Sequence, residues 1–280
     1  MNDLVIFILT HNRPNNVITY KSLKKCGYTG EIILIIDDQD PQKEKYLKRY
    51  QNIEIFSKNE IAQTFDEADN FQDRRTIVYA RNACFEIAKK RGYKYFVQMD
   101  DDYTGFEYRI YNESNTKPKQ IKNIDSVFQA LLSFYKSTTF ATIAMAQGGD
   151  FIGGKRNRMA KRPSLYRKAM NSFFCSVERP FKFSGRINED VNTYTAEQSR
   201  GLLMGTIPFV ALIQKQTQKN AGGMTDIYQA NGTYVKSFYT VIFSPSCCTI
   251  RPMGDKHKRL HHRVDWERCA PKIVSERNKH

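Results

Sequence analysis

Uninterrupted apolar runs alternate with stretches of helical character along the first part of the chain. The runs Leu4–Leu9, Glu31–Ile36 and Ile53–Phe56 are short, rich in Ile, Leu and Phe, and bounded by polar residues. Such runs are typical of strands that are buried on both faces of a parallel sheet. Residues 17–23 and 41–50 lie between them and have helical spacing or composition. The order strand, helix, strand, helix, strand predicts an α/β fold with a doubly wound sheet.

The same alternation continues into an acidic stretch. A helix is predicted over Thr76–Arg91, and a strand over the apolar run Tyr95–Met99. That strand ends in Asp100, Asp101 and Asp102. On an extended backbone alternate side chains point the same way, so Asp100 and Asp102 should face one side and Asp101 the other. Carboxylates at this spacing suit Mg²⁺ or Mn²⁺. A solvated polar turn is the alternative interpretation, because short motifs often arise by chance.

The second half of the chain is more elaborate. We predict a further strand over Phe140–Met145, a helix over Thr225–Tyr239 and a final strand over Val241–Phe243. No internal repeat or low-complexity linker divides the sequence. We therefore expect one domain over residues 1–280, with a mostly parallel, twisted sheet flanked by helices and an elaborated basic C-terminal half.

Composition narrows the classes of partner and compartment. The 280 residues include 44 Lys and Arg against 29 Asp and Glu, and the formal net charge of +15 suits a polyanion such as nucleic acid. The six cysteines form no Cys-x-x-Cys pair, and Cys26 and Cys84 are expected to be core residues. No apolar run approaches the roughly 18 residues of a membrane span, and no signal peptide is recognisable. We expect a soluble, cytoplasmic protein with reduced cysteines.

A basic segment lies between residues 151 and 177. It contains no acid and seven basic residues, with Tyr166, Phe173 and Phe174 among them. A run of charge is usually a solvated surface, but the aromatic residues and the glycine-rich stretch over 148–154 predict a folded basic lobe. Such a lobe neutralises phosphates and binds nucleic acid in a salt-dependent way. The seven residues are Lys155, Arg156, Arg158, Lys161, Arg162, Arg167 and Lys168.

A second acidic centre, Glu189-Asp190, lies ~90 residues after the triplet. An α/β half, an acidic triplet at a strand end and a later Glu-Asp pair together resemble a glycosyltransferase of the GT-A fold. More specific motifs together resemble the bacteriophage TET-associated glycosyltransferases, and this similarity covers most of the chain, from Ile6 to Ile273. These motifs are Ala80-Arg81-Asn82, Met99–Tyr103, Gln147–Asp150, Arg167–Asn171, Ile187–Tyr194, Gly222–Asp226, Gly232–Lys236 and His261-His262.

The resemblance implies a metal-dependent transfer from a nucleotide sugar, such as UDP-glucose, to a hydroxylated base in phage DNA, such as 5-hydroxymethylcytosine. The cytoplasm would then be that of the host cell. Residues 1–105 would be the nucleotide-sugar-binding half, and residues 106–280 the acceptor-binding and catalytic half. In such enzymes the Asp-x-Asp acids hold Mn²⁺ or Mg²⁺ against the donor diphosphate.

Site residues follow from the same resemblance. Asp102 is the first choice as direct metal ligand and Asp100 the second. His262 is the expected C-terminal ligand, with His261 and His257 as alternatives, and surface histidines in a basic tail are the structural alternative. The expected donor-binding residues are Thr10, Arg13, Asp37, Asp38, Lys58, Arg81 and Asp101.

The acceptor hydroxyl is a weak nucleophile and needs a base to take its proton. Asp190 is the expected base, with Glu189 beside it, and a single displacement would invert the anomeric configuration; the sequence does not distinguish inversion from retention. Helix capping near Val191 is the structural alternative for this acidic pair. A base inside a duplex must be flipped out or presented in single-stranded DNA. The expected acceptor-binding residues are Lys155, Arg156, Arg162, Arg167, Lys168, Asn171, Gln214 and Lys236.

Three other functions compete with this interpretation. A nucleotidyltransferase that makes a nucleotide sugar also uses an α/β fold and acids, but it prefers a glycine-rich first loop, which is absent here. A glycosyltransferase with a protein or polysaccharide acceptor would make the positive charge incidental. A non-catalytic DNA-binding module would leave the clustered acids unexplained, because they repel phosphate.

Overall fold

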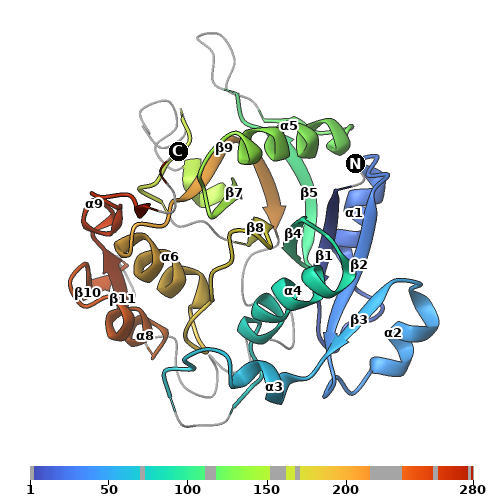
Figure 1. Ribbon diagram of the computed structural model, residues 1–280, viewed down its shortest axis with the longest axis horizontal. Helices are drawn as coiled ribbons and strands as arrows, with labels where there is room; N and C mark the ends of the chain where they lie inside the picture. The colour runs from blue at the N-terminus through green and yellow to red at the C-terminus, as the bar shows by residue number, and fades with distance from the viewer. Residues whose placement is uncertain are drawn as a thin grey trace.

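A single nine-stranded sheet forms the centre of the molecule in a computed structural model, with helices on both faces (Figure 1). The structure describes residues 3–69, 73–110, 118–151, 162–167, 171–214, 235–254, 258–276 and 279. The strand order is β3-β2-β1-β4-β8-β7-β9-β5-β6, so strands from both halves of the chain share one sheet.

The strands of this sheet fall into a parallel part and a mixed part. Strands β3, β2, β1 and β4 are all parallel, as is the pair β7 and β9. Strand β8 runs antiparallel to β4 and β7, and β5 runs antiparallel to β9 and β6. The predicted α/β class with a sheet flanked by helices is confirmed. The strands are β1 (Leu4–Leu9), β2 (Glu31–Asp37), β3 (Ile53–Phe56), β4 (Tyr95–Asp100), β5 (Tyr103–Tyr108), β6 (Lys119–Gln120), β7 (Thr142–Ala146), β8 (Ser172–Ser176) and β9 (Met204–Gln214).

The helices cover the sheet in two layers. Alternate residues of β1 enter opposite cores, because successive side chains of a strand point to opposite faces. Val5 and Phe7 belong to the core that also contains residues of α4 and α6, whereas Ile6 and Ile8 belong to the core that contains residues of α1 and α5. None of the helices in the described ranges is long and apolar enough to cross a membrane. The helices are α1 (Ile18–Lys25), α2 (Lys43–Arg49), α3 (Lys58–Ala62), α4 (Val78–Arg91), α5 (Ile124–Lys136), the 3₁₀ turn η1 (Gly148–Phe151), α6 (Glu189–Ser199), α8 (Val235–Phe243) and α9 (Trp266–Cys269).

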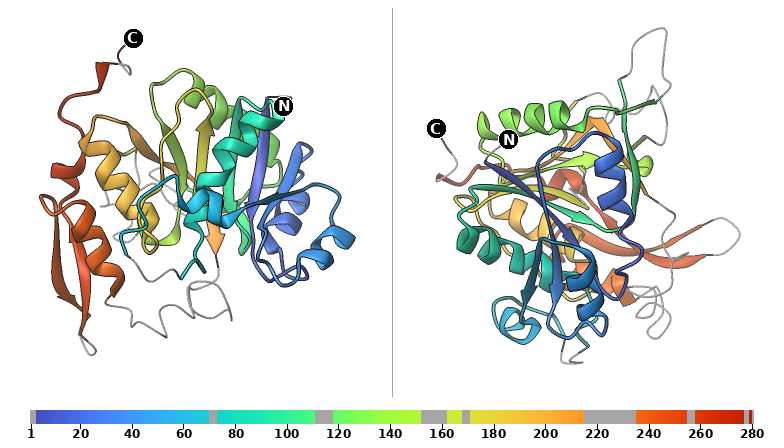
Figure 2. Two further views of the ribbon diagram at one scale, coloured as in Figure 1. Left: turned by 60° about the horizontal axis from the view of Figure 1, so that its bottom comes forward. Right: turned by 90° about the vertical axis from the view of Figure 1, so that its right-hand side faces the viewer.

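The C-terminal part departs from the sequence prediction. The predicted final strand Val241–Phe243 is wrong, because these residues form the last turn of α8. A short apolar run does not distinguish a strand from a buried helix, and here Tyr239 and Thr240 face inward at helical positions. Residues 225–234 of the predicted helix lie outside the described ranges. After α8 comes a hairpin of β10 (Cys248–Met253) and β11 (Arg259–Val264), which forms a separate sheet beside α6 and α8 (Figure 2, left).

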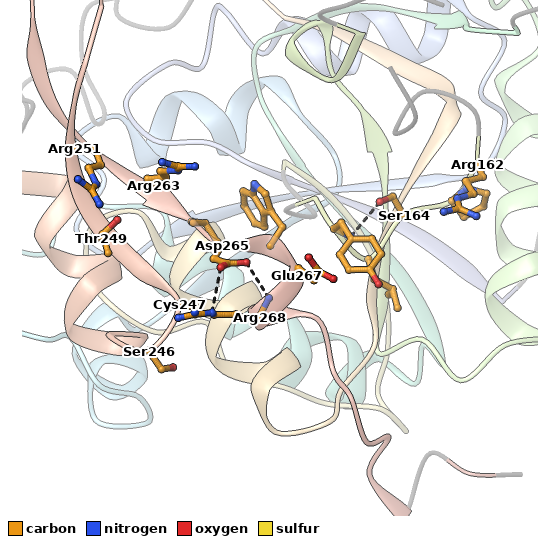
Figure 3. A pocket seen from close by; sticks show the side chains of 15 residues that line it. Arg162, Ser164, Ser246, Cys247, Thr249, Arg251, Arg263, Asp265, Glu267 and Arg268 are labelled. Carbon is orange, nitrogen blue, oxygen red and sulfur yellow. Dashed lines mark hydrogen bonds and ion pairs between the residues drawn. The ribbon is translucent and has the colours of Figure 1, made fainter. Parts of the chain in front are cut away.

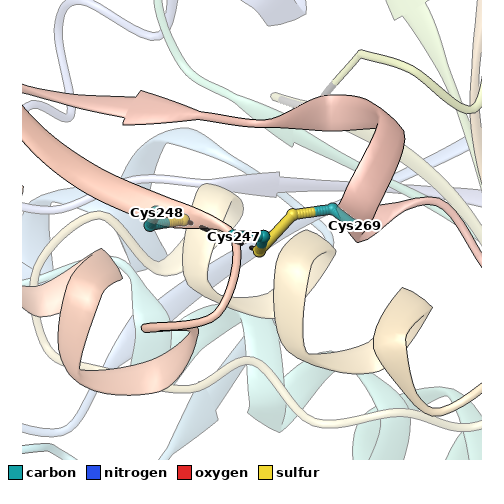
Figure 4. Close-up of side chains that lie close together, drawn as sticks. All are labelled: Cys247, Cys248 and Cys269. Carbon is teal, nitrogen blue, oxygen red and sulfur yellow. Dashed lines mark hydrogen bonds between the residues drawn. A yellow bond between two sulfur atoms is a disulfide. The ribbon is translucent and has the colours of Figure 1, made fainter.

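A disulfide links the start of this hairpin to α9. Cys247 and Cys269 are bonded, with their Cα atoms 6.0 Å apart, and the thiol of Cys248 lies 3.9 Å from the sulfur of Cys247 (Figure 4). That Cα separation is within the usual range for a disulfide. The expectation of reduced cysteines is therefore wrong for this pair. Cys26 and Cys84 are free and buried, as predicted.

Candidate active site

The candidate site is built where parallel strands end side by side. Leu9, the last residue of β1, pairs with Ile35 of β2 and with Asp100 of β4. The turns that follow these strands therefore lie at one edge of the sheet, where ligands of open α/β sheets bind. Predicted donor-binding residues from three separate sequence regions meet there.

The side chain of Asp101 is bound to the turn after β1 by a hydrogen bond and an ion pair. Its carboxylate accepts a 2.6 Å hydrogen bond from Thr10 Oγ1 and pairs with Arg13 Nη1 at 3.2 Å. Burial raises the pKa of Asp101, although Arg13 and Thr10 act in the opposite direction. The hydroxyl of Thr19 donates to the backbone carbonyl of Asp100 at 2.6 Å, which pins the triplet against α1. Asp101 thus helps to hold the turn, and a contact with donor sugar stays a prediction.

Arg81 joins the two acidic centres of the sequence. Its Nη2 pairs with Asp100 Oδ1 at 3.0 Å, and its Nε pairs with Glu189 Oε1 at 3.0 Å. The residue is 1% exposed, so it does not lie on a solvated helix surface. Its guanidinium lies 4.9 Å from the ring centre of Phe173 and 5.7 Å from that of Phe183, within range of cation–π attraction. One buried cation therefore compensates acids from β4 and from α6.

Neighbouring groups and burial shift the pKa values of these acids. Burial raises the pKa of Asp100 to about 7; Arg81 opposes the shift, and the carboxylates of Asp102, Glu189 and Asp101 add to it. Burial also raises the pKa of Glu189, again opposed by Arg81. Burial and the neighbouring carboxylates therefore outweigh the effect of Arg81 on both acids.

Glu189 and Asp190 open helix α6. Asn188 precedes them in the left-handed conformation, with φ of 62°, and makes no side-chain cap hydrogen bond. Glu189 is buried against Arg81, whereas Asp190 is half-buried and accepts from the amide of Val191 at 2.8 Å. The carboxylate of Glu189 is thus engaged by Arg81, and that of Asp190 is oriented by the first turn of the helix.

Asp102 is contacted from β9, the strand that pairs with β5 next to it. Gln214 ends β9, and its Nε2 donates to Asp102 Oδ1 at 3.0 Å and to Oδ2 at 3.2 Å. Gln214 Oε1 in turn accepts from Asn171 Nδ2 at 3.1 Å, and the carbonyl of Asn171 accepts a hydrogen bond from the Tyr103 hydroxyl. Asn171 and Gln214 therefore lie beside the triplet, and their predicted contact with the acceptor stays a prediction.

A second cluster forms around Asp37 at the end of β2. Lys58 Nζ pairs with Asp37 Oδ1 at 2.9 Å, and His11 Nδ1 lies 2.7 Å from Asp37 Oδ2. Burial raises the pKa of Asp37, but hydrogen bonds from His11 and Lys58 outweigh it, so the pKa is lowered overall. Asp38 is exposed and accepts from the amide of Lys58 at 3.1 Å.

Two residues of this cluster were not predicted. His11 contacts Asp37, and buried Asp40 accepts from the amide of Asn12 at 2.7 Å. The available signal was their position, because both lie in polar turns directly after buried strands. Together they fix the β1 turn that carries Thr10 and Arg13.

The donor set of the triplet fits a divalent cation, and the predicted histidine ligand does not join it in one close cluster. Asp100 and Asp102 offer carboxylate oxygens, the ligands that Mg²⁺ and Mn²⁺ prefer, and the carboxylate of Asp102 helps to raise the pKa of Asp100, after the larger effect of burial. Asp100, Asp102 and His262 do not form one cluster: among the described residues, Cys247, Cys248 and Cys269 alone bring three metal-ligating groups within 4.8 Å. The reason is that His262 lies in β11, within the separate hairpin.

The other C-terminal histidines and the basic acceptor residues are distributed as follows. His261 lies beside His262, and His257 is outside the described ranges. Lys155, Arg156 and Lys168 are likewise outside them. Arg162 is exposed, and Lys236 lies in the first turn of α8. Arg167 forms an ion pair with buried Asp150.

Comparison with known proteins gives first the class and then the family. A model of a glycosyltransferase family matches residues 4–223 of the 280 residues. The family is the TET-associated glycosyltransferases, and the chain belongs to it. The family prediction made from the sequence motifs is confirmed.

One solved structure with similarity to the chain is the crystal structure of GalNAc-T7 with UDP, GalNAc and Mn²⁺. The two are 14% identical with a TM-score of 0.41, over 75% of this chain and 43% of that chain. The chain thus spans less than half the length of that structure. No curated protein matches the sequence significantly.

Proposed function

We propose that this glycosyltransferase moves a sugar from a nucleotide sugar, UDP-glucose or a similar donor, to the hydroxyl of a hydroxymethylated base in DNA, with 5-hydroxymethylcytosine as the expected base. The observation that carries the proposal is the pairing of Arg81 with both Asp100 and Glu189. These two ion pairs connect the acids suited to binding the donor diphosphate with the acids suited to activating the acceptor hydroxyl. Family membership and the net charge of +15 support the same conclusion.

The donor end of the site is assigned to the edge formed by β1, β2 and β4. Asp102 and Asp100 are proposed to hold Mn²⁺ or Mg²⁺, which supplies positive charge against a departing nucleoside diphosphate. Arg81 Nη1 is buried and has no hydrogen-bond partner among the described residues. A buried donor without a partner is costly, so we propose that this N–H donates to an oxygen of the bound donor.

The nucleotide part is assigned to the cluster around Asp37. Asp38 is exposed at the end of β2, and its backbone neighbour Asp37 is held by Lys58 and His11. We propose that Asp38 contacts the ribose or base, because it lies at the same strand edge and retains an accessible carboxylate. Thr10 and Arg13 hold the adjoining turn through Asp101.

The acceptor end is assigned to the start of α6. Asp190 is proposed to take the proton of the acceptor hydroxyl as that oxygen bonds to the anomeric carbon and the bond to the diphosphate oxygen breaks. A single displacement of this kind inverts the anomeric configuration. Glu189 is fixed by Arg81 and is proposed to be a positioning residue.

The test measures transfer directly. Protein, Mn²⁺ and a panel of UDP-sugars are incubated with hydroxymethylated or unmodified DNA, and the digested nucleosides are analysed by mass spectrometry. We expect a hexose or pentose mass on the hydroxymethylated nucleoside alone. The absence of added sugar on every modified DNA would refute the acceptor assignment, and donor hydrolysis measured in parallel would test the donor assignment separately.

Matched variants separate the roles of the acids. Asp102→Asn should abolish turnover and metal-dependent donor binding. Asp190→Asn should abolish turnover and leave donor binding within about twofold, because a base acts after the donor is bound. Asp125→Asn is the control, since Asp125 is a carboxylate in the first turn of α5 that accepts hydrogen bonds from Thr29. Loss of donor binding in Asp190→Asn would contradict its assignment as the base.

A further inference from the structure

A cavity of about 1000 Å³ lies between the segment 162–166 and the C-terminal hairpin with α9. Figure 3 shows Arg251 and Arg263 on one side of it and Arg162 on the other. We call it the arginine pocket. It is lined by residues that far-apart parts of the chain contribute, and the acids of the candidate active site are not among them.

The lining of the arginine pocket carries a net positive charge, and its arginines are exposed to solvent. Arg162, Arg251, Arg263 and Arg268 line it, against Asp265 and Glu267. Asp265 forms an ion pair with Arg268 at 3.3 Å and accepts a hydrogen bond from the backbone amide of the same residue. Arg162, Arg251 and Arg263 are exposed, and no ion pair of theirs with another described residue is present. Guanidinium groups in such a setting match phosphate, which they bind bidentately.

Aromatic rings and hydroxyl groups lie between the arginines. Tyr166 is 44% exposed, and Trp266 packs edge-on against Tyr194 of α6 at 5.4 Å between ring centres. Both rings line the cavity, as do Ser164 and Thr249. Positive groups combined with accessible aromatic rings are characteristic of surfaces that hold single-stranded nucleic acid, because bases stack on the rings while phosphates meet the cations.

Helix α6 connects this cavity to the candidate active site. Glu189 begins the helix at Arg81, Tyr194 packs on Trp266, and Gln198 donates to the carbonyl of Leu165 at 3.2 Å. At 1.5 Å per residue, Tyr194 and Gln198 lie about 7.5 and 13.5 Å along the axis from Glu189. That is about two to four nucleotide steps at the 3.4 Å rise of a DNA strand.

We propose that the arginine pocket binds the DNA strand that carries the acceptor base, at nucleotides about two to four steps from the modified one. The inference rests on the proposed function and adds a site for the acceptor strand. Arg251, Arg263 and Arg268 lie beyond residue 223, where the family match ends. In this proposal the C-terminal hairpin and α9 contribute DNA-binding residues outside the region that the family model matches.

Binding is tested by fluorescence anisotropy with a labelled single-stranded oligonucleotide of about 12 nucleotides that contains one 5-hydroxymethylcytosine. Arg251→Ala/Arg263→Ala should weaken binding about tenfold or more at low salt. It should also reduce the slope of log K against log salt by about 1.4, which is two contacts at about 0.7 each. Tyr166→Ala should weaken binding about fivefold by removing a stacking surface.

The control removes the same charge elsewhere. Lys89→Ala/Lys90→Ala deletes two exposed cations from the last turn of α4 and should change affinity less than about twofold. Equal losses of oligonucleotide affinity in the two double variants would refute the assignment of the pocket as a DNA-binding site. Unchanged affinity in Arg251→Ala/Arg263→Ala would refute it too. Thermal unfolding of each variant checks that the fold is retained.

Two further measurements separate this inference from its alternatives. Sugar transfer to free 5-hydroxymethyl-deoxycytidine should be the same in wild type and Arg251→Ala/Arg263→Ala, because the free nucleoside has no neighbouring nucleotides to bind in the pocket. If wild type modifies no acceptor, the proposed function fails, while the binding measurement still tests whether the pocket binds DNA. Polyglutamate tests whether the occupant is an acidic protein segment. If it binds as tightly as the oligonucleotide, and the double variant loses both equally, the DNA assignment is overturned.

Discussion

Replacement of Arg81 by methionine should destabilise the protein far more than an ordinary arginine substitution. Arg81 is 1% exposed and pairs with Asp100 and Glu189 at 3.0 Å each. Removing one partner of a buried ion pair leaves an uncompensated charge, at a cost of about 3–5 kcal/mol. This is a large part of the 5–15 kcal/mol that typically separates folded from unfolded protein. The midpoint of thermal unfolding should fall by about 6–10 °C, at about 2 °C per kcal/mol.

The pH dependence of this effect has a definite sign. The pKa values of Asp100 and Glu189 are already raised in the folded state, and Arg81 opposes the shift in both. Without Arg81 they should rise further, so the folded state of Arg81→Met should bind protons that the unfolded state releases. Its destabilisation relative to wild type should therefore be larger at pH 8 than at pH 5.

Urea unfolding at both pH values, followed by circular dichroism, measures this difference. Arg200→Met is the matched control, because Arg200 pairs with Glu197 at 3.3 Å on α6 but its side chain is 73% exposed. It should change stability by no more than about 0.5 kcal/mol. Adding Asp100→Asn to Arg81→Met should recover part of the loss, because one buried charge is removed. A cost below about 1 kcal/mol for Arg81→Met at pH 8 would refute the reasoning.

Three other predictions concern separate parts of the molecule. Asp37→Asn should destabilise more at pH 7 than at pH 3 in urea unfolding, because the lowered pKa of Asp37, paired with Lys58, contributes stability that is present above its ordinary value near 4 and is lost as pH falls; equal losses at both values would contradict this. Cys269→Ser should lower the free energy of unfolding by about 3 kcal/mol under oxidising conditions, since its disulfide closes a separation of 22 residues, whereas Cys248→Ser, which removes a thiol outside the disulfide, should cost less. Mn²⁺ at about 100 times its Kd should stabilise wild type by about 2.7 kcal/mol in thermal unfolding, and EDTA should reverse this; the same gain in Asp102→Asn would exclude that residue as a ligand.

Much of the N-terminal half could be predicted from the sequence because its information is local. Buried parallel strands are nearly continuous apolar runs, so β1 and β2 were recognisable without knowledge of their neighbours. Their parallel pairing also brings the turns after β1, β2 and β4 to one edge, as the strand-end argument predicts.

Other features depend on contacts between distant segments and left no local signal. The link from Arg81 to Glu189 joins α4 to α6, and a helix pattern alone did not distinguish a buried arginine from a solvated one. Val241–Phe243 had the composition of a strand, but packing of α8 on α6 and on the hairpin determined its conformation. The disulfide of Cys247 and Cys269 likewise depends on how the hairpin folds back on α9.

The acidic triplet is stable because each carboxylate is held by a different part of the molecule. Arg13 and Thr10 hold Asp101, Arg81 holds Asp100, and Gln214 contacts Asp102. Two of these contacts bring a guanidinium, which offsets negative charge; the amide of Gln214 orients Asp102 without neutralising it. Adjacent acids repel one another, so such separate fixation sets their geometry before any ligand binds. In the proposed function, donor binding would then require little rearrangement of these side chains, which is the condition for a preorganised site.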